Sequence, residues 1–541
     1  MSSQDMTSAA TETDRRQFLS VIGTVGGTVA LSGCVGDDET EESPQSSDDE
    51  DSTEEPAVES ITVMQDAIAT TLDTQNHRAA ITTVTLSQAY EPLINRDVET
   101  AELVPFLAED WERVDDTTLR LFLRDDVLFH SGDQMTPEDV AFSINRIVDP
   151  DFGGIASPQR DRLGLVENAE VVEDENAVDL FMTGPSAIIL DQVAYAGDII
   201  MNEEWVSNRD EDEIAQDING TGPYMLSEYE EDVELVYERF EDYWRGPADI
   251  EEAVFIGSPE PSTRVSSIRA GEVDLATQIP PEDAPSLEEE ENLRITGEPA
   301  VRQVHTLLNT TKEPFDSHEF RLAMNYAVDV GEIIEEILSG FGTETEQCGL
   351  EEFVGYNPDI DPYPYDPERA EELIDESGYT DVELTYHLLT GDTALDVDVA
   401  EAVSGYLNEL SEVSVETRPR DFGSLLDEIA DGDLETSPPM SQTSWGNDSF
   451  DAGIWMVALF GPDAVMGSTD DEDIQQSVME AHDEPDAGTR DEMLQEVNRQ
   501  IHEHSSWLFL HQTYNIYGVS EEISWEPAIT EDIFVYDMGP Q

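Results

Sequence analysis

Lysine is nearly missing from this sequence of 541 residues: of its 24 Lys and Arg side chains, only Lys312 is a lysine. A phosphate-binding P-loop needs G-x-x-x-x-G-K-[ST], but Lys312 stands in T-T-K-E-P, which excludes nucleotide hydrolysis of that type. Its neighbours Glu313 and Pro314 also make it a poor candidate for a buried pyridoxal Schiff base. The 125 Asp and Glu residues give a formal net charge of −101. Because phosphate binding needs clustered cations, we expect no nucleic acid partner.

Cysteine is also scarce, with only Cys34 and Cys348, so the sequence offers no disulfide framework. We interpret Cys348 as a free thiol in a loop. His502 and His504 are two residues apart in a predicted helix and point to different faces, which argues against a shared metal site. The hydrolase patterns G-x-S-x-G and H-E-x-x-H do not occur. We therefore expect no metal, no cofactor and no catalysis, and an extracellular hydrolase is disfavoured.

The excess of acidic residues has two interpretations. A chain of high charge and low apolar content can stay disordered, and the apolar share here is 38%, below the usual ~45–50%. Most of the chain nevertheless has periodic apolar positions, and aromatic residues make up 8% of it. At 1 M salt the Debye length falls to about 3 Å, so repulsion between surface carboxylates is screened. We therefore interpret the chain as adapted to strong brine.

The N-terminal region predicts export and lipid anchoring. The pair Arg15 and Arg16 in D-R-R-Q-F-L-S resembles the twin-arginine export motif. The apolar run that follows, 21–31, is shorter than the ~18 residues of a membrane span. It ends in L-S-G-C, which resembles a lipoprotein cleavage box and makes Cys34 the lipidated residue. We expect residues 1–33 to be a signal peptide and the protein to lie on the outer face of the cytoplasmic membrane.

The next segment, 34–57, predicts a tether. It contains eleven acidic residues between Asp37 and Glu55, and residues 36–57 include no large apolar side chain. Such a segment cannot offset the entropy of ordering, and its charges repel one another. We expect a disordered, extended spacer.

Beyond residue 58, apolar residues recur at the spacings of strands and helices. Leu119, Leu121 and Leu123 alternate with arginines as in a half-buried strand, and residues 224–239 alternate as a hairpin that turns near 230–232. Thr136 precedes Pro137 and two acids, which predicts a capped helix start. Further helices are predicted at 320–338, between Asp366 and a Gly378 cap, at 399–410, and after a Thr489–Glu492 capping box. Further strands are predicted at 304–309, 382–389, 413–417 and within 508–541. The class is mixed α/β.

Several sequence blocks resemble one known family. They are F-L-A-E-D-W-E (106–112), L-R-D-D-V-L-F-H-S-G-D-Q-M-T-P-E-D-V-A-F-S (123–143), N-G-T-G-P-Y-M-L (219–226) with F-E-D-Y-W-R-G (240–246), R-V-S-S-I-R-A-G-E-V-D-L-A (264–276), F-R-L-A-M-N-Y-A-V-D (320–329) and Y-D-P-E-R-A-E-E-L-I (365–374). In this order they resemble the dipeptide/oligopeptide/nickel class of ABC-transporter solute-binding proteins, extracellular solute-binding protein family 5. The resemblance runs from about residue 61 to residue 530.

The resemblance implies an α/β fold of the periplasmic-binding-protein type II, a Venus flytrap of two lobes with three domains. By analogy, domain I comprises 58–94, 215–300 and 505–541, domain II comprises 95–214, and domain III comprises 301–504. The ligand would lie between domains I and III and be enclosed by hinge closure.

The function implied is solute capture for an ABC importer, with delivery of peptides to the permease subunits in the membrane. We expect a monomer that is not an enzyme. A nickel chelate or another small solute of the same transporter class remains the alternative, because the fold alone does not fix the ligand.

The stretch S-W-G-N-D-S-F-D-A-G carries the best binding candidates. Peptide-binding relatives have W-x-x-D at this place, which implies that Asp448 pairs with a peptide α-ammonium group and that Trp445 walls the pocket. Gly446 and Asn447 would add backbone or amide contacts. Tyr90, in A-Y-E-P-L, matches a second ligand-contacting segment of the class.

One departure concerns the ligand carboxylate. Peptide-binding members often place an arginine in the domain III loop after the strand that here ends at Leu389. Residues 390–398 contain three acids and no cation. This departure adds weight to a cationic or neutral solute.

Overall fold

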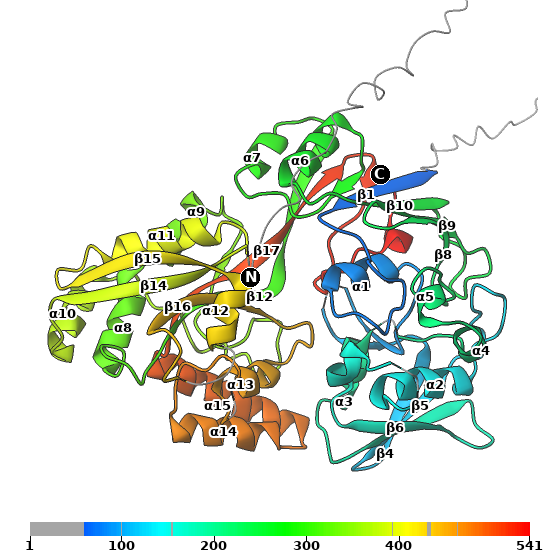
Figure 1. Ribbon diagram of the computed structural model, residues 1–541, viewed down its shortest axis with the longest axis horizontal. Helices are drawn as coiled ribbons and strands as arrows, with labels where there is room; N and C mark the ends of the chain where they lie inside the picture. Colours follow the sequence, from blue (N-terminus) through cyan, green and yellow to red (C-terminus); the bar gives the residue numbers. More distant parts are fainter. Residues whose placement is uncertain are drawn as a thin grey trace, which may run out of the picture. The chain divides into compact units, whose positions relative to one another are not determined.

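A sheet of eleven strands runs through the described part of the protein (Figure 1). The structure is a computed structural model that describes residues 59–541 apart from 99, 153–154, 198, 392, 430–433 and 463. The described residues belong to a single compact unit. The predicted signal peptide (1–33) with Arg15 and Arg16, the predicted lipidation site Cys34 and the predicted tether (34–57) lie outside the described residues.

Two long strands form the centre of this sheet. β12 (Leu293–Leu308) pairs antiparallel with β17 (Trp507–Ser520) over most of its length. Beside β12 lie β16 (Met440–Gly446), β14 (Val382–Thr390) and β15 (Val413–Asp421); beside β17 lie β11 (Leu275–Ala276), β1 (Ser60–Gln65), β10 (Glu252–Gly257), β9 (Glu234–Arg239) and β8 (Tyr224–Glu230). The short β13 (Thr343–Glu344) also pairs with β17.

A second sheet of four strands has its own core. Its order is β4 (Ala108–Asp115), β5 (Thr118–Leu123), β7 (Ala177–Met182) and β6 (Val166–Val171). Helix α2 (Pro137–Val148) packs its apolar face into the same cluster of buried residues. Two short pairs complete the strands: β2 (Ile94–Arg96) with β3 (Leu103–Pro105), and β18 (Ile523–Ser524) with β19 (Gly539–Pro540).

The helices cover the sheets on both sides of the long strand pair (Figure 1). In the first part of the chain they are α1 (Ala80–Leu86), η1 (Pro158–Leu163), α3 (Ile189–Ala196), α4 (Glu203–Ser207), α5 (Glu211–Ile214), α6 (Pro261–Ala270) and α7 (Ala284–Leu287). After β12 they are α8 (His318–Ala327), α9 (Val330–Glu336), α10 (Pro367–Ser377), α11 (Asp396–Leu407), α12 (Phe422–Ile429), α13 (Ala452–Phe460), α14 (Glu472–His482), α15 (Ala487–His504) and η2 (Val535–Asp537).

The buried apolar residues divide into two lobes that share β12 and β17. In β17, Trp507 and Phe509 pack into one core cluster and Leu508 and Leu510 into another, because successive side chains of a strand point to opposite faces. Farther along, Val519 packs into a cluster formed with residues of β1, β8 and β10. One strand therefore contributes to the cores of both lobes, which fixes where they meet.

Several predicted elements are confirmed. The strand at Leu119–Leu123 is β5, and the hairpin at 224–239 is β8 and β9, with its turn at 231–233. Thr136 caps α2 in a capping box with Asp139. Gly378 closes α10 in the left-handed region, with a φ of 79°. The segment 508–541 contains the expected strands at 508–520, 523–524 and 539–540, which make up half of it.

The single helix predicted at 320–338 is wrong. α8 ends at Ala327, Val328 is extended, and Asp329 accepts a hydrogen bond from the backbone N–H of Glu332 to start α9. The apolar periodicity continues across the break because both helices pack against the same core. Periodicity alone therefore could not reveal the interruption.

The capping box predicted at Thr489 is also wrong. α15 begins at Ala487, and its cap is Asp486, which accepts hydrogen bonds from the backbone N–H of Thr489 at 2.9 Å and from its hydroxyl at 2.8 Å. Thr489 therefore lies within the first turn. The aspartate three residues earlier fills the same role, because both residue types supply the oxygen that a helix start needs.

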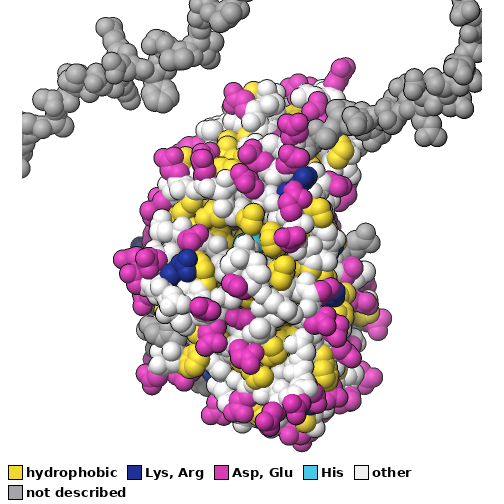
Figure 2. Space-filling model, turned by 90° about the vertical axis from the view of Figure 1, so that its right-hand side faces the viewer, with side chains coloured by type: hydrophobic (Ala, Val, Ile, Leu, Met, Phe, Trp, Pro, Cys, Tyr) yellow, Lys and Arg dark blue, Asp and Glu magenta, His cyan; other side chains and the backbone are white. Residues whose placement is uncertain are grey.

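Carboxylates are widely distributed on the surface. Figure 2 shows one face on which Asp and Glu side chains are spread over the whole area and Lys and Arg occupy only a few places.

We predict that Gly220→Ala lowers the free energy of unfolding by about 1–3 kcal/mol, the usual cost of forcing extra atoms into a packed site. A Cβ atom at Gly220 would lie 1.9 Å from the Ala89 carbonyl oxygen. Urea unfolding at constant salt measures the change. The control is Gly405→Ala in α11, where a Cβ atom meets nothing within 4 Å; it should raise stability by about 0.5–1 kcal/mol. Equal stabilities of the two variants would contradict the packing argument.

Candidate functional site: an acidic cavity between the lobes

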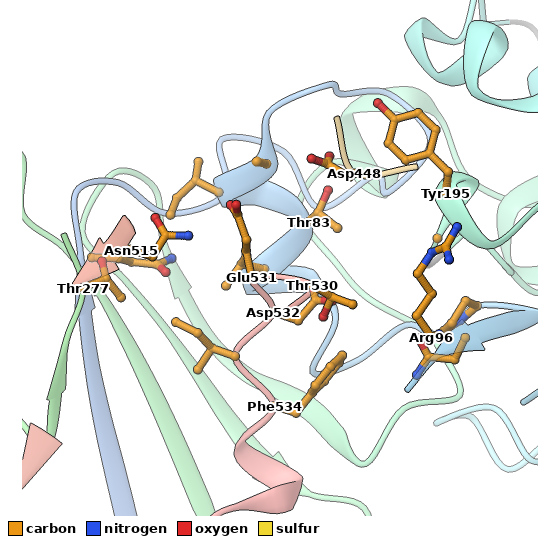
Figure 3. Close-up of a pocket in the computed structure, with 18 of the residues that line it drawn as sticks. Thr83, Arg96, Tyr195, Thr277, Asp448, Asn515, Thr530, Glu531, Asp532 and Phe534 are labelled. Carbon is orange, nitrogen blue, oxygen red and sulfur yellow. Dashed lines mark hydrogen bonds between the residues drawn. The ribbon is translucent and has the colours of Figure 1, made fainter. Parts of the chain in front are cut away.

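A cavity of about 390 Å³ lies where residues of the two lobes meet. Its volume falls within the ~300–1,000 Å³ typical of small-molecule sites. The first lobe contributes residues from α1, β2, η1, α3 and the segment 530–534, and the second contributes Asp448 and Phe450 (Figure 3). Its charged lining residues are the acids Asp66, Asp448, Glu531 and Asp532 and the arginines Arg96 and Arg162.

A bulge in β12 holds two acidic segments in place. The pairing of β12 with β17 is irregular between Pro299 and Gln303, and in this stretch the backbone groups of Val301 point toward the β16 side of the strand. The Val301 N–H donates to Glu531 Oε1 at 2.7 Å, and its carbonyl accepts from the Asn447 N–H at 2.9 Å. One residue of the connecting strand thus fixes both Glu531 and the loop that carries Asp448.

A buried ion pair supports the Asp448 loop from behind. Arg490 of α15 donates to both carboxylate oxygens of Asp451, at 2.6 and 2.7 Å, and both side chains are at most 3% exposed. Asp451 also caps α13 by accepting from the Ile454 N–H. A Cβ atom at Gly453 would lie 2.4 Å from the Arg490 guanidinium, so this glycine leaves room for the pair.

Burial and mutual repulsion shift the acids of the cavity toward their neutral forms. The Asp448 side chain is partly exposed to the cavity, but protein atoms surround it on the other sides. This partial loss of water raises the pKa of Asp448, and the positive charges of Arg162 and Arg302 oppose the rise. Burial also raises the pKa of Glu531, with a further contribution from Asp448. Burial raises the pKa of Asp532 to about 7, and the charges of Asp448 and Glu531 act in the same direction. A positive ligand would relieve this repulsion.

Arg96 connects the lobes beside the cavity. Its guanidinium pairs with Asp191 of α3 at 2.9 Å and donates to the Ser449 carbonyl of the second lobe at 2.7 Å. It also lies over the ring of Phe450, with 4.9 Å from Cζ to the ring centroid. The charge of Arg96 is therefore already compensated by protein groups.

The backbone is strained at three points of the cavity wall. Gln278, Phe450 and Glu531 have φ values of 49°, 57° and 65°, a region that side-chain-bearing residues adopt at a cost of ~1–3 kcal/mol. Strain of this kind persists where the surrounding structure enforces it, and it gathers at binding sites.

The five predicted ligand-binding residues occupy different places. Asp448 lines the cavity and points into the same space as Glu531 and Tyr195 (Figure 3). Trp445 is half-buried against the core of the second lobe, and Gly446 ends β16 next to the Arg302 guanidinium. Asn447 is buried and donates to the Asp451 carbonyl, which shapes the loop. These three residues adjoin the cavity without lining it.

Tyr90 lies apart from the cavity lining. It is 1% exposed in the core of the first lobe, and its hydroxyl is 3.5 Å from the Leu72 carbonyl. Burial raises the pKa of its phenol. An aromatic residue just before a strand can either pack in the core or contact a ligand. Tyr90 packs in the core of the first lobe.

Sequence reasoning missed Glu531, Asp532 and Arg162. Glu531 and Asp532 stand in I-T-E-D-I, and among 125 acids nothing in the sequence distinguishes this pair. Arg162 stands in P-Q-R-D-R-L, far in sequence from residues 390–398. The scarcity of cations is a signal that could have drawn attention to it, because the sequence has only 23 arginines to examine.

The cavity as built favours an organic cation or a zwitterion. Three acids at one end offer only hydrogen-bond acceptors when ionised. Across the described residues there is no group of three or more His, Cys, Asp or Glu side chains placed to hold a metal ion. None of the helices that the structure describes is long and apolar enough to span a bilayer.

Two α/β lobes that share a pair of strands and enclose a solute-sized cavity define a solute-binding protein. The chain belongs to extracellular solute-binding protein family 5: the family model described as "Bacterial extracellular solute-binding proteins, family 5 Middle" matches residues 102–467, well over half of the sequence.

Relatives with known roles agree with this family. The di/tripeptide-binding protein 2 of Pseudomonas aeruginosa is 26% identical over 434 residues, which are 75% of this chain and 81% of that protein. The DppA protein of Helicobacter pylori, solved with the peptide STSA, has a TM-score of 0.70 and 21% identity, covering 89% of this chain and 98% of that one. The NikA protein of Staphylococcus aureus, solved with Ni(L-His)2, has a TM-score of 0.68 and 15% identity, covering 89% of this chain and all (100%) of that one. The fold is thus the two-lobed type II fold, as the resemblance implied.

We predict that Arg490→Met lowers the free energy of unfolding by about 3–5 kcal/mol, because it leaves the buried Asp451 carboxylate unpaired. Denaturant unfolding at constant salt measures the loss. The matched control on the same helix is Arg499→Met. The Arg499 side chain is 45% exposed, and its guanidinium pairs with Glu503 at 2.9 Å. It should cost less than ~1 kcal/mol. Similar losses in the two variants would contradict the supporting role of the Arg490 pair.

Proposed function

We propose that this protein captures short peptides outside the cytoplasm and delivers them to the permease of an ABC importer. The observation that carries the proposal is the position of Asp448: it stands on the second lobe, opposite Glu531 and Asp532 of the first, on the wall of one cavity. A peptide α-ammonium group would be held there by carboxylates from both lobes.

Physical chemistry favours an ammonium ligand at this end. Charge-assisted hydrogen bonds are about twice as strong as neutral ones. They are stronger still inside a protein, where the effective dielectric constant is lower than in water. The three acids destabilise one another in the free protein, so a positive group gains both direct attraction and relief of repulsion. The carboxylates that would bind the ammonium group stand on both lobes, so the bound ligand favours the closed arrangement of the lobes.

The names of relatives support peptides as the solute class. The Pseudomonas relative is a di/tripeptide-binding protein, and the Helicobacter structure holds a peptide. The nickel–histidine complex in the Staphylococcus structure keeps a nickel chelate as the alternative. Mass spectrometry of ligand retained through purification in high salt separates the two, since a chelate brings nickel and a peptide does not.

We also propose that the protein is exported by the twin-arginine route, anchored through lipid on Cys34 and spaced from the membrane by residues 34–57. Residues Arg15 and Arg16 carry the export signal in this proposal. In the same proposal, the surface carboxylates keep the protein soluble in brine. Domains I, II and III have the boundaries expected from the resemblance. The protein performs no catalysis; turnover of a peptide library by the purified protein would contradict this.

We predict that Asp448→Asn weakens binding of a short peptide by at least ~1.5 kcal/mol, the loss expected when a charge-assisted bond becomes neutral. Calorimetry at molar salt measures the affinity. The control Asp375→Asn removes an exposed acid of α10 outside the cavity lining and should leave the affinity unchanged. Unchanged affinity in Asp448→Asn would remove this residue from the binding site.

We predict that peptide affinity rises between pH 6 and pH 7. The pKa of Asp532 is about 7 in the free protein, and a bound ammonium group lowers it, so binding below pH 7 must release a proton. Affinity should fall again where the peptide amine, with a pKa of ~7.7–8.0, loses its charge. Calorimetry in buffers of different ionisation enthalpy measures the released protons. In Asp532→Asn the rise should flatten; an affinity that falls from pH 6 to pH 7 contradicts the mechanism.

A further inference from the structure

Arg96 joins the first lobe to the second one residue away from Asp448. It belongs to β2 of the first lobe, and its Nη2 atom donates to the Ser449 carbonyl of the second lobe at 2.7 Å. A hydrogen bond is lost when its donor and acceptor are more than about 3.5 Å apart. Because this bond spans the boundary between the lobes, opening of the lobes at the cavity must break it. The bond therefore belongs to the closed arrangement alone.

The first lobe holds Arg96 in place without help from the second. Its Nη1 atom donates to the Ala101 carbonyl at 2.8 Å, and its Nη2 atom also donates to the Asp191 carboxylate at 2.9 Å. Ala101 follows β2 in the chain, and Asp191 lies in α3. The guanidinium therefore keeps its charge partner and its position when the lobes part. Because the side chain is held in advance, little conformational entropy is lost when the bond to Ser449 forms.

The contact between Arg96 and the second lobe excludes water. Ala101 is 5% exposed and Phe450 is 3% exposed, and both belong to the same cluster of buried apolar residues. The Arg96 side chain is itself 9% exposed, and its Cζ lies 4.9 Å from the centroid of the Phe450 ring. A hydrogen bond in such surroundings is stronger than one in water, and the ring face adds a cation–π attraction.

The Ser449 carbonyl stands in a loop whose parts are tied together. The Asn447 side chain accepts from the Ser449 N–H at 3.0 Å and donates to the Asp451 carbonyl at 2.9 Å. The Asp451 carboxylate is held in turn by Arg490. Asp448 lies between Asn447 and Ser449, so a bond that fixes Ser449 also fixes where the Asp448 carboxylate stands relative to the first lobe.

The lobes of the empty protein are not held closed by charge at the cavity. The Asp448 charge contributes to the raised pKa of Glu531 on the opposite lobe, so the two carboxylates repel each other across the cavity. This repulsion opposes closure until a positive ligand has entered. The bond between Arg96 and Ser449 acts in the other direction, and it is available only once closure has begun.

We propose that Arg96 is a positioning residue that latches the two lobes together after a peptide has entered, acting through Ser449 to hold Asp448 against the first lobe. This inference rests on the proposed function and specifies how the captured peptide is retained. Although Arg96 lines the cavity, its guanidinium already donates to three protein oxygens, so it acts on the lobes and not on the ligand. The latch sets the rate at which the lobes reopen, and it does so for every peptide alike.

The test measures binding kinetics with synthetic di- to tetrapeptides built only from Ala, Gly, Ser and Leu. The full protein is incubated with the mixture in molar salt, and mass spectrometry identifies the peptides that it retains. Association and dissociation rates of three retained peptides, and of the same peptides as C-terminal amides, are then measured by stopped-flow fluorescence. Calorimetry checks that the ratio of the rates agrees with each affinity.

The variant Arg96→Gln should release every one of these ligands faster. We expect the dissociation rate to rise at least about tenfold, as for the loss of a hydrogen bond to a charged group. The association rate should change less than about twofold, because the peptide enters before the latch forms. The factor should be the same for free acids and amides, since Arg96 does not touch the ligand.

The control Arg113→Gln removes an arginine whose bonds stay within the first lobe. Arg113 stands in β4, donates to the Ser186 carbonyl at 2.6 Å and does not line the cavity, so both rates should stay unchanged. Arg96→Lys keeps the charge beside Asp191 but has a single donor nitrogen in place of the guanidinium fork, so it should also accelerate dissociation. Thermal unfolding checks that each variant is folded.

Three results would overturn the latch while leaving peptide capture intact. They are an unchanged dissociation rate in Arg96→Gln, a loss confined to the free acids, which would place Arg96 on the ligand carboxylate, and an association rate that falls as strongly as dissociation accelerates. If Arg96→Gln does not fold, an unchanged dissociation rate in Arg96→Lys overturns it instead. Retention of no peptide by the wild-type protein would overturn the proposed function and the inference with it.

Discussion

The irregular stretch of β12 around Val301 is the constraint on which the cavity depends. The backbone N–H and carbonyl of a strand residue point to the same side, and those of Val301 point toward β16, because its carbonyl accepts from the Asn447 N–H one residue beyond the pairing of Arg302 with Gly446. Its N–H donates instead to Glu531 of the first lobe. The acids that face the ligand are therefore set by the same strand that connects the lobes, and any change of its register would move both of them.

Two kinds of charge occur in this protein, and their surroundings distinguish them. Asp451 with Arg490 and Asp73 with Arg146 are buried pairs in which each charge is fully matched, so they shape loops and helix starts. In the cavity, the charges of Asp448, Glu531 and Asp532 act on one another, and Arg162 lines the same cavity without an ion pair to any of them. The buried ion pairs support the fold, whereas the charges of the cavity are not fully compensated by protein groups. A ligand with the opposite pattern of charge can compensate them.

The residues of the site differed in how readily the sequence revealed them. The resemblance singles out Asp448, because it completes W-x-x-D with Trp445, and the structure places it just after β16 on the cavity wall. Tyr90 matched a family segment equally well, but its ring lies in the core, because an aromatic next to a strand serves packing as readily as binding. Glu531 and Arg162 gave no local signal, since their roles come from residues far away in sequence, Val301 and Tyr195.

Local patterns and composition determined the class of the fold, most of its strands and helices, and the family, because alternation, helix caps and motif order are properties of neighbouring residues. The resemblance also put Asp448 forward as a candidate binding residue. The tertiary structure alone decided where α8 ends, which acids meet in the cavity and which arginine stands opposite them. Burial and distance govern these features, and both arise only when β12 and β17 bring residues hundreds of positions apart to one place.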